Sequence, residues 1–395
     1  MEKIKSFMRR ETVLSAAAIL AVLSMAFVTP DKEYGAYIDY KTIGLLFSLM
    51  TVMAGLQSLG LFRAMGGMLL SRVKGPGPVA AVLVFLCFFF SMAITNDVAL
   101  ITFVPFAVTV LKMAGMEPLA LPVVMLQTIG ANLGSMLTPV GNPQNLYLYS
   151  KAGMGAGQFL AVMAPYTGVS FAMLGICLAV LGVRTGRRNR WNAPVRMESG
   201  YPQLDETAYG TEAGNRNTEN HRRPGVPAGK LCIYGLLFLL CLGCVAHIIP
   251  WQALLAVVAV TVWLVDRSLF LRVDYSLLLT FCAFFIFIGN MGRVPVFCGF
   301  LNRVLAGREV ITAVGASQVI SNVPAALLLS GFTQDYKSLI VGTNLGGLGT
   351  LIASMASLIS YKYIARLYPA EKGRYLGWFT LINLLFLAVL LAMAV

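Results

Sequence analysis

Four short polar stretches interrupt apolar parts of the chain, and their residue types suit the binding of small ions. Residues 95–97 and 321–324 each place an asparagine after a threonine or serine, and the longer stretches 132–145 and 344–357 are rich in Gly, Asn, Ser and Thr. In hydrocarbon, unpaired backbone groups cost several kcal/mol, so such breaks persist only where protein, water or a ligand satisfies them. Free N–H groups at helix starts suit an anion, and free carbonyls with amide and hydroxyl oxygens suit Na⁺.

The polar and helix-breaking residues of these stretches form the candidate binding set. The set is Thr95, Asn96, Asp97, Asn132, Thr138, Gly141, Asn142, Pro143, Gln144, Asn145, Ser321, Asn322, Val323, Pro324, Thr343, Asn344, Gly349, Thr350 and Ser354. One candidate Na⁺ site consists of Thr95, Asn96, Gly141 and Asn142, and a second of Ser321, Asn322 and Thr350.

Asp97 is the only acidic residue in segment 77–112. A carboxylate inside a membrane costs about 2.5–3.5 kcal/mol on insertion scales and is a functional candidate by default. Asp97 could bind Na⁺, take up a proton, or cap the helix that follows it. The second stretch has Val323 at the matching position, so the two stretches are not equivalent.

Several of these residues also have a purely structural interpretation. Glycines such as Gly346 and Gly349 permit close helix packing in membranes, and the hydroxyls of Thr138 and Thr350 could bond to their own helices. Packing explains the run 141–145 poorly, because four polar or helix-breaking residues follow a glycine there. We therefore expect a solute or ion site at that run.

The composition identifies the surroundings of these stretches as a membrane. Of 395 residues, 58% are hydrophobic and 12% charged, whereas soluble domains carry about 25% charged residues. Uncharged runs such as 12–28 and 159–183 are long enough to cross about 30 Å of hydrocarbon. The net charge of +13 arises from Lys and Arg gathered near span ends, which indicates topology rather than nucleic-acid binding.

Other chemistries have little support in the sequence. The seven cysteines lie in or beside apolar runs, and the pair Cys241 and Cys244 has no matching second pair, so they are interpreted as small buried residues. No HExxH motif, convincing GxSxG motif or phosphate-binding loop occurs. We predict that the chain is not an enzyme and that it contains no ATP motor of its own. The sequence is compatible with a separate ATPase subunit.

Matched landmarks divide the chain into two halves. The pair at 95–96 is matched 226 residues later at 321–322, and GANLGSMLT (130–138) is matched 212 residues later by GTNLGGLGT (342–350). The positive-inside rule assigns the N-terminus and the basic segment 184–230 to the cytoplasm, and it gives the halves opposite orientations. The arms of segment 310–334 are about a dozen residues each, about 18 Å of helix, which is too short to span.

The predicted fold is an all-α polytopic membrane protein with two inverted repeats, about ten transmembrane helices and two re-entrant hairpins with interrupted helices. The predicted divisions are 1–183 (hairpin 77–112, broken helix 118–150), the cytoplasmic linker 184–230, and 231–395 (hairpin 310–334, broken helix 336–366). We expect a multi-pass protein of the inner or plasma membrane.

The motifs TNDVALITFVPF, GANLGSMLTPVGNPQN, SNVPAALLL and GTNLGGLGT resemble those of the ion transporter superfamily. This superfamily includes arsenite permeases, NhaD-type antiporters, citrate-transporter-like proteins and divalent anion/sodium symporters, and the likeness is strongest to uncharacterised bacterial anion permeases. The resemblance implies a scaffold that often dimerises and a mobile transport domain with an elevator-like motion. The dicarboxylate symporters carry Ser-Asn-Thr at both tips; Asp97 and Val323 replace those threonines here, which favours the arsenite permease pattern over a dicarboxylate substrate.

The predicted function is secondary transport of a small anion or oxyanion, such as a di- or tricarboxylate, arsenite or an inorganic anion, coupled to Na⁺ or H⁺. The alternative is a Na⁺/H⁺ antiporter in which Asp97 titrates. A channel suits paired hairpins around a central site less well than alternating access does. The expected partners are the solute, Na⁺ or H⁺, the lipid bilayer and, from the resemblance, a second copy of the chain. No nucleic acid and no cofactor besides Na⁺ as coupling ion is expected.

Overall fold

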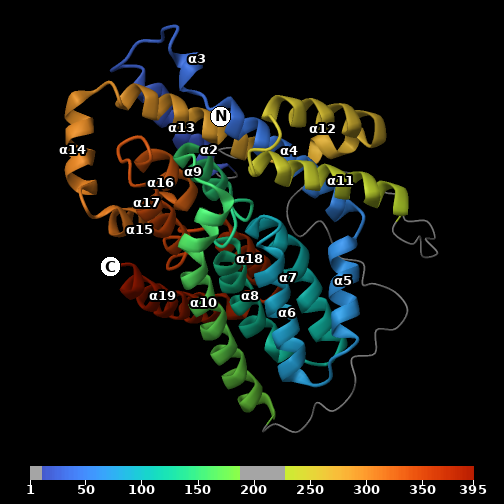
Figure 1. Ribbon diagram of the computed structural model, residues 1–395. Coiled ribbons are helices and arrows are strands. Elements are labelled where there is room, and N and C mark those ends of the chain that lie inside the picture. The colour runs from blue at the N-terminus through green and yellow to red at the C-terminus, as the bar shows by residue number, and fades with distance from the viewer. Residues whose placement is uncertain (1–10, 187–226) are drawn as a thin grey trace.

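The computed structural model describes residues 11–186 and 227–395, and within these ranges every regular element is helical (Figure 1). The first half contains α2 (Thr12–Ser24), α3 (Tyr34–Tyr37), α4 (Tyr40–Ser58), α5 (Leu61–Leu70), α6 (Pro76–Phe90), α7 (Asn96–Met113), η1 (Glu117–Leu119), α8 (Ala120–Ser135), α9 (Pro143–Ala152) and α10 (Ala156–Gly186). The second half contains α11 (Ala228–Val245), α12 (Trp251–Val265), η3 (Arg267–Arg272), α13 (Tyr275–Met291), α14 (Pro295–Leu305), α15 (Glu309–Ile320), α16 (Asn322–Leu329), α17 (Tyr336–Leu345), α18 (Met355–Leu367), η4 (Pro369–Glu371) and α19 (Lys372–Ala394).

Aspartate caps start the helices at corresponding places in the two halves. An oxygen of Asp39 accepts the Thr42 backbone N–H at the start of α4, and an oxygen of Asp274 accepts the Leu277 N–H at the start of α13. Each bond satisfies one of the N–H groups that a helix start leaves without an intrahelical partner. Each helix is followed by a bend, of 53° between α4 and α5 and 105° between α13 and α14.

Within the described residues, four helical segments are long and apolar enough to cross a membrane: α7, 156–184 of α10, α11, and 369–394. The number is up to six if each bent pair is one span. The sequence predicted about ten spans. The difference arises because α2 and α12 have only 13 and 15 residues, and because α8/α9 and α17/α18 are each interrupted. Exposed apolar side chains cover the outsides of several helices, Leu236 and Leu264 among them, as expected for surfaces that face lipid.

The helices pack in two groups. In the first group, α2 packs on α13, and α11 and α12 pack on α4. The second group contains α6 to α10 and α15 to α19, in which α6 packs on α8, α15 on α17, and α18 on both α7 and α8. Figure 1 shows the first group beside the second, and α4·α9 and α13·α16 are contacts between them.

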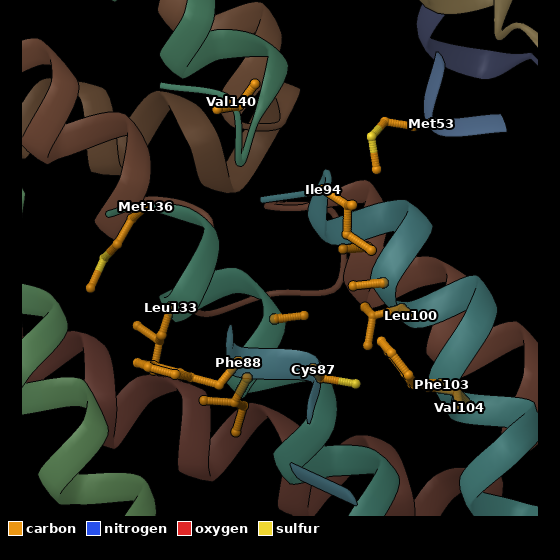
Figure 2. Close-up of a cluster of buried hydrophobic side chains, with 14 of the residues drawn as sticks. Met53, Cys87, Phe88, Ile94, Leu100, Phe103, Val104, Leu133, Met136 and Val140 are labelled. Carbon is orange, nitrogen blue, oxygen red and sulfur yellow. The ribbon is translucent and has the colours of Figure 1, made fainter. Parts of the chain in front are cut away.

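A buried apolar cluster supports the first hairpin. Figure 2 shows Leu100 and Phe103 of α7 close to Cys87 of α6, with Ile94 just before the 95–97 tip. All four of these side chains are at most 2% exposed. The tip therefore projects from a packed base, so that its polar residues have a fixed position.

The predicted hairpins and broken helices correspond to pairs of helices. Segment 77–112 contains α6 and α7, and 310–334 contains α15 and α16. Segment 118–150 is interrupted between α8 and α9, and 336–366 between α17 and α18; we call residues 136–142 and 346–354 the first gap and the second gap. The predicted linker 184–230 lies mostly outside the described residues, and helix reaches further into it than expected, to Gly186 and from Ala228.

Candidate functional site

Each hairpin tip is bonded to the gap of its own half. The Asn96 backbone N–H donates to the Gly141 carbonyl at 3.1 Å, and the Asn322 N–H donates to the Ala353 carbonyl at 3.0 Å. These two contacts are equivalent in the sequence repeat. The donors, Asn96 and Asn322, lie 226 positions apart, and the acceptors, Gly141 and Ala353, lie 212 positions apart, which are the two offsets of the repeat. Tip and gap therefore form one polar unit in each half.

Four helices begin at these units, and none is capped by the side chain at its start. The N-cap residues are Thr95 for α7, Asn142 for α9, Ser321 for α16 and Ser354 for α18. All four are residue types that usually cap a helix, yet none of their side chains accepts a backbone N–H of its own first turn. The N-cap side chains therefore leave the positive ends of all four helices open, and within their first turns Asn96 Oδ1 accepts the Asp97 N–H of α7 at 3.0 Å.

Asn132, at the end of α8, joins the two halves. Its oxygen accepts from Asn96 Nδ2 and from Ser354 Oγ, both at 3.0 Å, and its Nδ2 donates to Ser357 Oγ at 3.2 Å. All four residues are at most 6% exposed. One side chain thus fixes the first tip against the start of α18, which belongs to the other half.

Asn344 makes the corresponding contact in the opposite direction. It lies 212 positions after Asn132, at the end of α17, and its Nδ2 donates at 2.6 Å to Asn145 Oδ1 in α9. Asn145 and Ser357 are themselves 212 positions apart. Each half therefore extends an asparagine to the first turn of the other half's broken helix, and all four helix starts become linked.

Several buried polar atoms near the tips and gaps have no hydrogen-bond partner among the described residues. They are Asp97 Oδ1, both amide atoms of Gln144, and Asn344 Oδ1. Gln144 is 1% exposed and Asn344 is 4% exposed. A buried polar group left unpaired costs about 1–3 kcal/mol, so a ligand or water is the natural partner for these atoms. Three of the four atoms are acceptors, which suits a cation or a solute with hydroxyl groups.

Other predicted residues have hydroxyls that are already engaged. Thr343 Oγ1 donates to the Leu339 carbonyl of its own helix at 2.8 Å. Thr138 Oγ1 donates to the Met92 carbonyl, and Thr350 Oγ1 donates at 3.4 Å to the Gln318 carbonyl. Thr138 and Thr350 thus bond a gap to its hairpin, and Thr343 bonds within α17. Pro143 begins α9, and Pro324 lies in the first turn of α16.

The structure adds three residues to the predicted set. Ser357 contacts Asn132, Asn142 Nδ2 donates to Ser135 Oγ at 2.7 Å, and the Gln318 amide bonds the second gap. The offset of 212 could have identified Ser357 as the counterpart of Asn145. No sequence signal points to Gln318, because its position in the first half is occupied by Met92.

One cavity lies away from the tips. It has a volume of 520 Å³ and is lined by α14 and α15 residues and the turn between them, including Arg303 and Arg308. The second, of 290 Å³, is lined by α9 residues on one side and by Asp39 and α13 residues on the other. The second cavity therefore lies at the boundary between the two helix groups, beside the α9 end of the site.

Lys151 provides a positive charge in the second cavity. Its Nζ donates to Tyr147 Oη at 3.1 Å and to Ser330 Oγ at 3.3 Å, and the cation lies over the Tyr147 ring. Arg293, by contrast, is bonded to Asp31 at 2.6 Å and to Tyr37, away from the tips. This hydrogen bond from the Arg293 guanidinium lowers the pKa of the Asp31 carboxyl. Arg293 therefore connects loops and does not contribute to the candidate site.

Comparison with known proteins finds a family model and two relatives that each match most of the chain. The family model described as "Citrate transporter" matches residues 1–335. Inner membrane protein YbiR of Escherichia coli is 30% identical over 87% of this chain and 86% of its own length. An uncharacterized transporter of Methanocaldococcus jannaschii, MJ0456, is 30% identical over 95% of this chain and 94% of its own.

A more distant relative matches less than half of the chain. The silicon efflux transporter LSI3 of rice (Oryza sativa subsp. japonica) is 33% identical over 42% of this chain and 34% of its own length. The comparisons confirm the resemblance to the ion transporter superfamily, and they identify a multi-pass membrane protein of the transporter class. The chain belongs to the citrate transporter family.

Proposed function

We propose that this protein is a secondary carrier that moves a small anion or oxyanion across the membrane, coupled to Na⁺ or H⁺. One observation carries the proposal: four helix starts without an N-cap side-chain bond, two from each half, are joined in one network. Asn132 contacts α7 and α18, Asn344 contacts α9, and backbone bonds hold each tip, including the α16 start, to the gap of its own half. Positive helix ends attract the negative groups of a solute, and amide side chains fix its orientation. A site made jointly by both halves is the arrangement that alternating access requires.

The solute is proposed to be small and rich in oxygen. The buried polar side chains of the described residues are hydroxyls and amides without a Lys or Arg, so helix ends supply the positive potential. The unpartnered acceptors would bind hydroxyl groups of the solute or an accompanying cation. Citrate, succinate, arsenite, phosphate and sulfate meet this description, and the family description and the silicon efflux relative support an oxygen-rich solute.

For the mechanism, we propose an elevator motion of the second helix group against the first. The repeats are proposed to be inverted, with the first group as scaffold, a dimer contact on that scaffold, and the N-terminus in the cytoplasm. The few contacts between groups and the 290 Å³ cavity on their boundary support a surface along which one group slides. Helices of the two halves pack on one another throughout the second group, which supports its movement as one body.

The single substitutions Asn96→Ala, Asn142→Ala and Asn322→Ala should each abolish uptake, while the folded protein remains in the membrane. The amides of these residues orient a tip or a gap, so a solute would lose its positioned ligands without loss of the helices. Uptake of the five anions into proteoliposomes, with and without Na⁺, is the measurement. Ser170→Ala, which alters a buried α10 hydroxyl bonded within its own helix, is the control. Full uptake by all three variants would remove the site assignment.

Replacing Asp97 by asparagine should change the pH or Na⁺ dependence of uptake more than the choice of solute. The variant keeps the size of the side chain but removes its charge and its capacity to release a proton at neutral pH. Initial uptake rates from pH 5.5 to 8.5, at several Na⁺ concentrations, give the profile to compare with wild type. Glu371→Gln, which neutralises an exposed carboxyl in η4, is the control. An unaltered profile would assign Asp97 to stabilising the α7 start alone.

The unpartnered oxygen of Asp97 also favours a second candidate, a Na⁺/H⁺ antiporter without an anionic solute. A carboxylate at the tip could exchange one cation for another by itself. Vesicles with a trapped pH indicator separate the two functions. Sodium-driven proton movement with no anion added would support the antiporter, and anion uptake above empty vesicles would support the carrier.

A further inference from the structure

The second gap contains a half-buried side chain that the first gap lacks. In the second half, Gln318 of α15 extends its amide into the second gap. Its Nε2 lies 3.0 Å from the Gly346 carbonyl oxygen and 2.9 Å from that of Leu348, and 3.3 Å from the Val314 carbonyl of its own helix. One nitrogen thus faces three carbonyl oxygens, the kind of ligand that an alkali cation would seek there.

The other end of the amide completes the contact. Gln318 Oε1 accepts the Thr350 backbone N–H at 3.0 Å. Gly349 makes room for it, because a Cβ built at this position overlaps Gln318 Oε1, and the positive φ of 105° also favours glycine. The amide of Gln318 is therefore bonded at both ends, and the second gap is shaped around it.

The hairpin of the first half has no counterpart of this amide. Met92 occupies the position of Gln318, and Leu137 occupies that of Gly349, so both members of the contacting pair differ. In the first half the amide that bonds the gap comes from α9: Asn145 Nδ2 donates to the Ser135 and Thr138 carbonyls, both at 3.3 Å, and its oxygen accepts from Asn344.

The first half instead has a carboxylate. Asp97, with a buried oxygen that no described group contacts, stands where the second half has Val323. The groups that favour a cation are thus concentrated at the first tip, and the group that replaces a cation lies in the second gap.

We propose that the Gln318 amide takes the place of a cation in the second gap, so that this protein binds at most one coupling cation, at the first tip. An amide N–H₂ group presents partial positive charge to the carbonyls and fills the space that a cation would need. The second half then holds its gap rigidly without an ion. This inference rests on the proposed ion-coupled transport and assigns its stoichiometry.

The test counts Na⁺ bound per chain, which requires no knowledge of the solute. Full-length protein in nanodiscs is titrated with radioactive ²²Na⁺ at pH 8.5, and the sites are counted at saturation. Wild type should bind no more than one Na⁺. Gln318→Glu should bind one more than wild type, because a carboxylate facing three carbonyl oxygens needs a cation to be stable. Gln318→Met, which copies the first half, should gain no such site, and Gln158→Glu, at an exposed α10 position, controls for the added charge.

The outcomes separate this inference from the carrier function. Two Na⁺ on wild type, or no gain by folded Gln318→Glu, overturns the Gln318 assignment, even if anion uptake is robust. Failure of wild type to take up any anion of the panel overturns the carrier, whatever the Na⁺ count. Elution from a size-exclusion column and the melting temperature of each variant establish that folded protein was measured.

Discussion

Replacing Asn132 by alanine is expected to abolish uptake and to lower the stability of the second helix group. The substitution removes the acceptor of Asn96 Nδ2 and Ser354 Oγ, and the acceptor role of Ser357 Oγ is lost as well. Each buried polar group left unpaired costs about 1–3 kcal/mol, so a total of about 3 kcal/mol is expected after partial rearrangement. The first tip would also lose its connection with α18, and with it the link between the halves.

Asn344→Ala is the matched variant, 212 positions away. Asn344 Nδ2 donates to Asn145 Oδ1 and to the Ile340 carbonyl of its own helix, while its oxygen has no partner in the described parts of the chain. Its removal leaves only one acceptor in the other half unpaired, so uptake should fall with less loss of stability. Thermal unfolding of the purified variants, followed by intrinsic fluorescence, gives the comparison. Equal destabilisation by the two substitutions would contradict the role of Asn132 as the main link.

The sequence predicts the kind of fold and the locations of its interruptions better than the contacts between them. Gly134 lies one residue before the end of α8, and Pro143 is the first residue of α9. Both ends of this interruption are therefore signalled by the local sequence. The all-helical membrane class, the family and the transporter class are confirmed. The number of full spans stays a prediction, because apolar composition alone does not give the length of a helix that bends or stops inside a segment.

The partners of the polar residues depend on how the halves meet. Asn132 could have faced its own hairpin alone, and nothing near it in the sequence indicates that Ser354 and Ser357 lie within hydrogen-bond distance. The repeat shows that positions 132 and 344 correspond. It does not show that the side chain at each position contacts the other half. Long-range packing decides this. The binding roles of the residues stay predictions.

The asymmetry between the halves is the feature with the most functional content. If the two halves served only as a scaffold, the same side chain could occupy corresponding positions in both. When the two halves are aligned, Asp97 corresponds to Val323, Gln144 to Ala356 and Met92 to Gln318. Asp97 and Gln144 have unpartnered atoms among the described residues, whereas the Gln318 amide is bonded at both ends. Asn344 Oδ1 of the second half is also unpartnered among the described residues, so the proposed ligand would contact both halves, with more of its contacts in the first.

Substituting Gly134 by alanine should be among the most harmful single-methyl changes in the chain. A Cβ on Gly134 would overlap the carbonyl oxygen of Phe88, and would lie 2.6 Å from Ser91 Oγ and 2.7 Å from the Phe88 carbonyl carbon. Backbone atoms cannot rotate away, so α8 would have to separate from α6, the helix on which it packs most closely. Overpacking typically costs about 1–3 kcal/mol, and this case should lie at or above the upper end.

Gly130→Ala, one turn earlier on α8, is the control. Its nearest neighbour, the Val84 carbonyl oxygen, would lie 3.5 Å from the new Cβ, an ordinary van der Waals distance. Both substitutions place the same methyl group on the same helix, so helix propensity cannot explain a difference between them. We expect Gly130→Ala to retain the wild-type melting temperature and uptake, and Gly134→Ala to lose folded protein at physiological temperature. If the two variants melted together, the close approach of α8 to α6 would not be what holds the first gap against its hairpin.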